Sequence, residues 1–174
     1  VYTQSAGQIA EEIRSESIPV VTSISEVSGD IDIIHAHHTP VAATAICRYP
    51  DVPAVFVAHD FVAWHDSPPL FPSIRYYVAV DATVAERLAA ESGVEPAQLR
   101  VLLNAVDTRR FQPGPPLPAK PHRALAYAKN LGHIDVIRRA CSARRIAVDF
   151  VGSAVGKIIE APESVLAGYD LVFA

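Results

Sequence analysis

The sequence of 174 residues has little of several features that mark particular classes of protein. It contains no methionine, one tryptophan and two cysteines, Cys47 and Cys141, which lie far apart in separate helical segments. This spacing argues against a disulfide framework and favours reduced thiols. No apolar run approaches about 18 residues, the length that a membrane-spanning helix needs, and no signal peptide is visible. We therefore expect a cytoplasmic protein, with peripheral association with a membrane left open.

The chain also lacks an excess of positive charge. Its net charge is −4, and its lysines and arginines are dispersed. The one local excess, Arg138-Arg139 with Arg144-Arg145, falls on a predicted helix and is expected to be a solvated face. This balance predicts that nucleic acid is not a partner. Half of the residues are hydrophobic and one-fifth are charged, which is typical of a globular protein.

Short apolar runs alternate with helical patterns along the first hundred residues. Their continuous apolar character is typical of buried parallel strands, and the alternation predicts an α/β fold with a Rossmann-like parallel sheet. Thr39 before Pro40, and Thr83 with Glu86, have the residue types that begin helices. Strands are expected at 18–24, 31–36, 53–59, 76–80 and 100–104, and helices at 7–17, 39–49 and 83–92.

Composition changes at 112–121, a stretch that holds five of the fourteen prolines. It cannot be a helix or a central strand, and it suits a semi-rigid linker. Strand, helix and strand patterns resume beyond it and continue to the last residue, which predicts an incomplete second βαβ unit. We expect a domain at 1–111 whose first strand is missing, a linker at 112–121 and a truncated domain at 122–174. With no methionine at position 1, the chain is expected to be a central portion or a reduced relative of a longer protein.

Polar side chains follow three of the predicted strands. His35, His37 and His38 end one strand, His59-Asp60 end the next, and Asn104 with Asp107 follow a later one. Ligands of open parallel sheets bind beyond the carboxyl ends of the strands, so these residues should converge on one sheet edge. Individually, Asn104 and Asp107 could equally be turn residues.

The density of histidines raises the alternative of a metal site. Alternate side chains of a strand point the same way, so His35 and His37 could hold zinc as in amidohydrolase barrels, with His59 as a third ligand. That barrel is too long for this chain and is interrupted by the prolines. We therefore expect no metal. His38 is expected to support the start of the following helix.

Four segments together resemble the retaining glycosyltransferases of family 4, which have the GT-B fold. They are "DIIHAHH", "PAVFVAHD", "YYVAVDATVAERL" and "VLLNAVDTRRFQP". Asn104, Val106, Asp107, Phe111 and Pro113 match the family pattern N-G-V-D-x-x-x-F-x-P, with Ala105 in place of its glycine. The resemblance covers roughly residues 31 to 113 well and the rest loosely.

The resemblance implies transfer of a hexosyl group from a nucleotide-sugar, which serves as co-substrate, with no cofactor. His59 would be the catalytic cleft histidine that contacts the donor sugar. His35, His37, Asp60, Asn104 and Asp107 would bind substrate. The acceptor is unknown and could be a saccharide, a lipid-linked group or a small molecule. A homodimer is left open.

The chain departs from the family pattern in the second unit. Where the family has G-R-x-x-x-x-K-G, this sequence has "AYAKNLGH", which lacks the arginine. Lys129 is the remaining candidate to bind the donor phosphates. The paired-glutamate motif of the family is expected beyond Ala174. These departures keep two alternatives open, a non-catalytic glycosyltransferase-like binding module and a metal-dependent hydrolase built on His35, His37 and His59.

Overall fold

The computed structural model describes residues 1–128 and 132–173. The chain divides into two compact units, Val1–Asn104 and Ala105–Ala174, and each is described by itself. Within the described ranges, every helix is too short or too polar to cross a bilayer.

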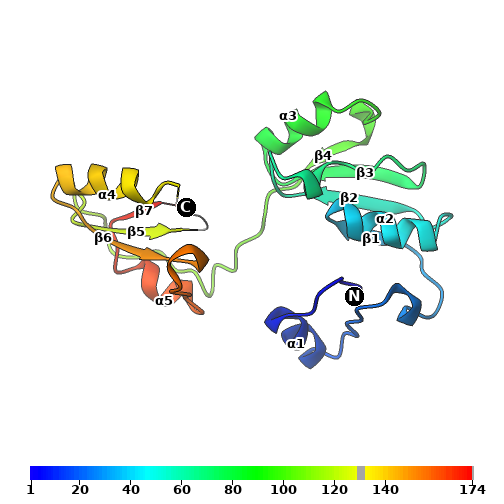
Figure 1. Cartoon of the computed structure of the whole chain (residues 1–174), viewed down its shortest axis with the longest axis horizontal. Helices are drawn as coiled ribbons and strands as arrows, with labels where there is room; N and C mark the ends of the chain where they lie inside the picture. Colours follow the sequence, from blue (N-terminus) through cyan, green and yellow to red (C-terminus); the bar gives the residue numbers. More distant parts are fainter. Residues whose placement is uncertain (129–131, 174) are drawn as a thin grey trace. The chain divides into compact units, whose positions relative to one another are not determined.

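A four-stranded parallel sheet forms the centre of the first unit. Its strands lie in the order β1-β2-β3-β4, so that β1 is an edge strand (Figure 1). The register sets His37 beside Val57, and Ala58 beside Ala79. This confirms the predicted α/β class with a parallel sheet. The strands are β1 (Ile34–His37), β2 (Ala54–Ala58), β3 (Ile74–Ala79) and β4 (Leu99–Val101).

Two helices connect these strands and cover the core. Helix α2 (Thr39–Arg48) packs on β1, and α3 (Ala82–Ala90) packs on β3 and β4. Each helix has apolar residues four apart on its buried side, Ala42 with Ile46 in α2 and Val84 with Leu88 in α3. Burying a large aliphatic or aromatic side chain stabilises a fold by about 1.5–3 kcal/mol. The sheet therefore forms a rigid base for the loops at its carboxyl edge.

The N-terminal segment differs from the predicted pattern. Helix α1 (Gln8–Ser15) forms as expected, but 18–24 is not a strand of the sheet. Val21 instead makes one isolated parallel bridge with Tyr2. A short 3-10 helix, η1 (Ile24–Glu26), follows. A strand needs a neighbour to satisfy its backbone groups, and here the only described partner is a few residues around Tyr2.

The capping residues of two helices differ from those that the sequence suggested. Helix α2 begins at Thr39, and its N-cap residue is His38, whose side chain makes no capping bond. The Thr39 hydroxyl donates to the Ser67 carbonyl instead. Helix α3 is capped by Asp81, whose Oδ1 accepts from the Val84 N–H at 2.8 Å. Asp81 reaches the third backbone N–H of the helix directly, so Thr83 is not the cap.

The second unit holds a smaller parallel sheet in the order β6-β5-β7. Its core centres on Ala124, Cys141 and Ile146. The second parallel sheet confirms the βαβ pattern predicted after the prolines. Its elements are β5 (Arg123–Tyr127), α4 (Ile134–Ala143), β6 (Ala147–Val151), η4 (Ser153–Val155), α5 (Pro162–Leu166) and β7 (Leu171–Phe173).

The segment before β5 belongs to the second unit. Arg110 forms an ion pair with Glu163 of α5, with the Nε and Oε1 atoms 2.8 Å apart. Gly114 lies next to Ala167, so a Cβ there would be 3.9 Å from it. The stretch 112–121 therefore runs along α5 at its beginning, and its role as a linker stays a prediction.

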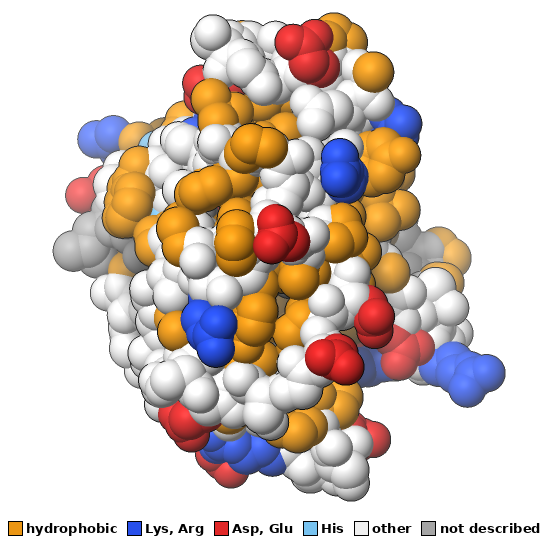
Figure 2. Space-filling view, turned by 90° about the vertical axis from the view of Figure 1, so that its right-hand side faces the viewer, with side chains coloured by type: hydrophobic (Ala, Val, Ile, Leu, Met, Phe, Trp, Pro, Cys, Tyr) orange, Lys and Arg blue, Asp and Glu red, His pale blue; other side chains and the backbone are white. Residues whose placement is uncertain are grey.

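The surface mixes apolar and charged side chains. Figure 2 shows hydrophobic side chains spread across the visible face, with separate acidic and basic groups between them. Within the first unit the large exposed hydrophobic residues include Ile9, Ile33, Val62 and Trp64. Val62 and Trp64 belong to the loop that follows β2, which also carries the candidate site.

Candidate functional site

Five of the seven histidines gather at the carboxyl ends of β1 and β2. His35, His37 and His38 come from the end of β1, His59 follows β2, and His65 lies in the short 3-10 helix η2 (Trp64–Asp66). Neighbouring rings have centroid separations of 4.7 Å for His35 and His37, and 4.9 Å for His37 and His59. The convergence expected of His35, His37 and His59 is therefore seen in the structure.

His37 and His59 form the closest polar contact of the cluster. His37 Nδ1 lies 2.6 Å from His59 Nε2, and the two rings are stacked at 24°. Such a bond needs one nitrogen that donates and one that accepts. Partial burial, and then the positive charges of His35, His59 and His38, lower the pKa of His37 below 6.5. The tautomers of the two rings therefore decide which of the two nitrogens donates.

Asp66 bonds to both of the strand ends that carry this cluster. Its side chain is fully buried. Its Oδ1 accepts from His38 Nδ1 at 2.8 Å, and its Oδ2 accepts from the His59 backbone N–H at 2.9 Å. One carboxylate therefore connects the end of β1 to the end of β2. A buried carboxylate is costly unless it is paired, and both of its oxygens are bonded here.

Arg87 of α3 holds the loop that follows β2. Its guanidinium donates to the Asp60 carbonyl at 2.6 Å, the Ala63 carbonyl at 3.1 Å and the Ser67 hydroxyl at 2.9 Å. The Asp60 side chain accepts from the Val62 and Ala63 backbone N–H groups. These two bonds, Val62 first, lower the pKa of Asp60. The loop is thus fixed at both ends and at its tip.

The backbone at His38 adopts an unusual conformation. Its φ is 60° and its ψ is 126°, a region that residues with a side chain rarely occupy. Such a conformation costs about 1–3 kcal/mol and persists where the surroundings hold it, often at functional sites. Here the side chain of His38 is bonded to Asp66, and its carbonyl accepts the Ala42 N–H at 3.0 Å.

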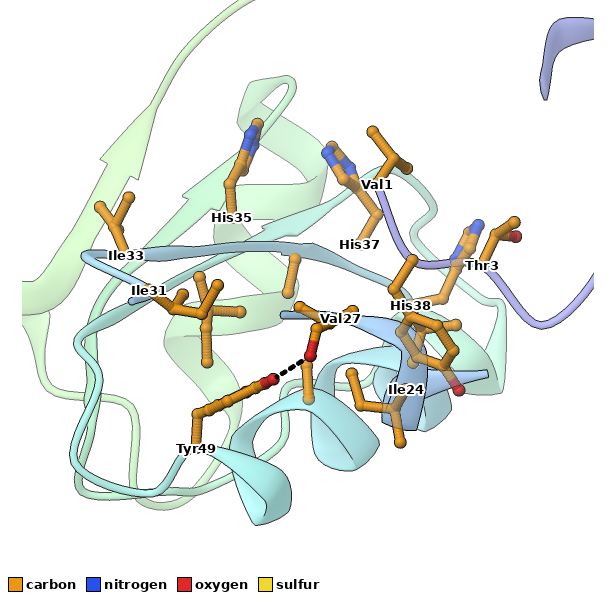
Figure 3. A pocket seen from close by; sticks show the side chains of 15 residues that line it. Val1, Thr3, Ile24, Val27, Ile31, Ile33, His35, His37, His38 and Tyr49 are labelled. Carbon is orange, nitrogen blue, oxygen red and sulfur yellow. Dashed lines mark hydrogen bonds between the residues drawn. The ribbon is translucent and has the colours of Figure 1, made fainter. Parts of the chain in front are cut away.

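A pocket of about 600 Å³ opens beside β1. Figure 3 shows His35 and His37 on the same side of β1, and Ile31, Val27 and Tyr49 along the apolar part of the pocket. The Tyr49 hydroxyl donates to the Val27 carbonyl at 3.1 Å. The pocket therefore combines an apolar wall with imidazole groups at its rim, the composition usual for small-molecule sites.

The loop after β2 carries an exposed apolar tip. Val62 and Trp64 are 79% and 73% exposed, and Phe61 is 51% exposed. The Trp64 ring meets the His65 ring edge-on, with centroids 5.8 Å apart. Because Arg87 and Asp60 fix the loop, these side chains are held outward rather than collapsed on the core.

The other predicted site residues make no described contact with the histidine cluster. Asn104 is exposed and ends the first unit. Asp107 belongs to the second unit, where its Oδ1 accepts from the Arg109 N–H at 2.9 Å, as the turn alternative expected. Lys129, the candidate for phosphate binding, lies outside the described residues. The roles of these residues stay predictions.

Three residues that support the site were missed in the sequence. Asp66 sits in a loop with no regular pattern around it, and Arg87 has the appearance of a solvated charge on a helix. His65 is separated from the other histidines by five residues or more. A signal was nevertheless present, since a second His-Asp pair, His65-Asp66, follows His59-Asp60 within seven residues.

The open parallel sheet places the first unit in the Rossmann-like class of domains, in which ligands bind at the carboxyl edge where these polar groups gather. The family model described as Glycosyltransferase Family 4 matches residues 11–110. That range holds β1 to β4 and every candidate residue of the first unit, and the chain belongs to this family. Membership supports a glycosyltransferase-like function and is consistent with a GT-B type N-terminal domain. No curated protein matches the chain.

Proposed function

We propose that the first unit is the acceptor-side domain of a retaining glycosyltransferase that acts in the cytoplasm. The enzyme would transfer a hexosyl group from a nucleotide-sugar to an acceptor during carbohydrate biosynthesis. The observation that carries the proposal is the His37–His59 pair at the carboxyl edge of a family 4 sheet. This is the sheet edge at which open α/β folds bind ligands.

The histidines suit a ligand rich in hydroxyl groups. A neutral imidazole offers one donor and one acceptor, so a row of them can match several hydroxyls at once. In the proposal His59 contacts the donor sugar, while His35 and His37 face the acceptor. Asp60 shapes the loop that holds His59, since its side chain already accepts two backbone N–H groups.

Catalysis in this proposal depends on position and electrostatics. The bond from the anomeric carbon to the donor phosphate oxygen breaks, and a bond to the acceptor oxygen forms. The proton of the acceptor leaves with the nucleoside diphosphate. Imidazole N–H groups at the sheet edge would hold the sugar in place, and Lys129 is the proposed partner of the diphosphate.

Ligand-dependent stability tests the donor class. A longer protein that contains residues 1–174 is heated with and without UDP- and GDP-sugars, and one of them should raise the melting temperature, because a ligand that binds the folded state stabilises it. His122→Ala, which changes a histidine of the second unit outside the cluster, should show the same ligand-dependent rise in melting temperature as the wild type. If no nucleotide-sugar changes the melting temperature, the donor assignment is wrong.

A non-catalytic binding module is the second candidate. It is favoured by the absence of the family's arginine from "AYAKNLGH". The longer protein would then bind a carbohydrate or a nucleotide-sugar without consuming it. Release of nucleoside diphosphate in the presence of candidate acceptors separates the two functions. The hydrolase alternative needs an eight-stranded barrel, whereas the described sheet of this unit is open and has four strands.

A further inference from the structure

We propose that His38, His65 and Asp66 form a binding site for a divalent transition-metal ion of the zinc class. One nitrogen from each histidine and one oxygen of Asp66 lie within 4.8 Å of one another. This set differs from His35, His37 and His59, the set that the sequence suggested. The site is independent of sugar transfer, and no step of that reaction requires it.

The donor atoms have the chemistry that zinc prefers. Imidazole nitrogen and carboxylate oxygen bind Zn²⁺ at about 2.0–2.2 Å. Ligand atoms of a tetrahedral ion are then about 3.3 Å apart, so the most distant of the three would move in by roughly 1 to 1.5 Å. The histidine side chains are the parts that can move, since Asp66 is fully buried and fixed. Three protein ligands would leave a fourth position for water.

The carboxylate is already oriented for this role. Its Oδ2 is bonded to the His59 backbone N–H at 2.9 Å, which directs Oδ1 toward His38. An ion seated between His38 and Asp66 would take the place of the proton on His38 Nδ1, and the neutral ring would carry that proton on Nε2 instead. Hydrogen bonds that orient a ligand in this way are usual around metal sites.

Of the three proposed ligands, His65 has the fewest polar contacts in the structure. Its ring lies edge-on to His38, with centroids 4.7 Å apart, and it makes no hydrogen bond within the described part of the chain. The neighbouring Asp60 carboxylate interacts electrostatically with His65, which adds negative charge beside the site. An ion would therefore give His65 a partner and join the helix η2 to the end of β1.

Calorimetric titration of the metal-free full chain with Zn²⁺ tests the proposal. We expect one ion per chain, and at least a tenfold loss of affinity in His65→Ala, which removes a ligand without removing a hydrogen bond. His122→Ala and His133→Ala remove the two histidines outside the cluster and should leave the affinity unchanged. Co²⁺ should give a visible absorption spectrum in the wild type that His65→Ala weakens.

Two results would overturn the proposal. One is the absence of stoichiometric Zn²⁺ binding by a folded chain. The other is binding that His37→Ala or His59→Ala abolishes while His65→Ala leaves it intact, because the ion would then sit at the other pair. Asp66→Asn gives a second check once circular dichroism shows that it is folded, and it should also weaken binding at least tenfold.

Discussion

The two units use polar residues in opposite ways. In the first unit five histidines gather at the carboxyl edge of the sheet, and of these His65 makes no hydrogen bond within the described residues. In the second unit, Asp149 is bonded to the Tyr169 hydroxyl and Arg123, and Asp170 to the backbone N–H groups of His122 and Arg123. The polar groups of the second unit named here therefore form their hydrogen bonds with one another. The comparison teaches that position on the sheet and remaining bonding capacity indicate a site better than the number of polar residues does.

Removal of His59 should give the largest effect. In the longer enzyme, His59→Ala is expected to lower the transfer rate by roughly 100-fold or more, the usual cost of losing a positioned donor. His122→Ala in the second unit should leave the rate unchanged. Initial rates of nucleoside diphosphate release measure both. Equal losses in the two variants would contradict the comparison between the units.

Asp66 sharpens the comparison through stability. Asp66→Asn loses a charged acceptor from a buried position and should lower the free energy of unfolding by about 2 to 3 kcal/mol. Asp149→Asn, which changes an exposed carboxylate, should have a much smaller effect because exposed ion pairs contribute little. Urea unfolding of the full chain, followed by circular dichroism, gives both values. If Asp149→Asn lowers the free energy of unfolding more than Asp66→Asn does, the buried carboxylate of the first unit is not the more important of the two for stability.

The two units should also respond to acid at different pH. The pKa of folded His37 is lowered from 6.5, so the folded chain binds fewer protons there than the unfolded chain, and stability falls as the pH drops below 6.5. Backbone N–H groups of His122 and Arg123 lower the pKa of Asp170 from 3.8, and its contribution is lost only below that pH. Melting temperatures of the wild type and His37→Gln between pH 8 and 5 test the first part. If the melting temperature changes with pH equally in the wild type and in His37→Gln, His37 is not the source of the pH dependence.

Asp170→Asn is the matching variant for the second unit. Its melting temperature should run parallel to that of the wild type between pH 8 and 5, and the two curves should converge below about pH 3.8. If the melting temperatures of Asp170→Asn and the wild type diverge near pH 6.5, the two units do not respond to acid at different pH values as proposed.

Arg87 should give the smallest effect. Arg87→Ala removes three bonds to the loop after β2 but leaves Asp66 in place. Backbone amides of residues 59–67 are expected to exchange with deuterium several-fold faster, with little change in global stability. Arg123→Ala should not alter exchange in that loop. Unchanged protection in Arg87→Ala would mean that Asp60 and Asp66 suffice to fix it.

The strands and their histidines could be predicted because both signals are local. Continuous apolar runs end at His35–His38 and at His59, and parallel strands carry their carboxyl ends to one edge. The expected strand at 18–24 failed because pairing, not composition, decides whether such a segment is a strand. Thr83 failed as a cap because the helix begins one residue before it, at Ala82, with Asp81 as the N-cap.

The support of the site was harder to predict for a physical reason. Asp66 and Arg87 act on groups up to 28 residues away, so nothing in their own neighbourhood reveals them. The partner of the His38 side chain, Asp66, is likewise distant in the sequence. Pairing across the chain determines these roles, and a single sequence shows only the residue types.

Trp64 gives the chain a natural optical reporter. It is the only tryptophan in the sequence, and its exposed ring touches the ring of His65. Tryptophan emission excited at the red edge of its absorption therefore comes from one loop alone and carries no signal from the second unit. A change in the wavelength or intensity of this emission would report binding at the histidine cluster without an added label.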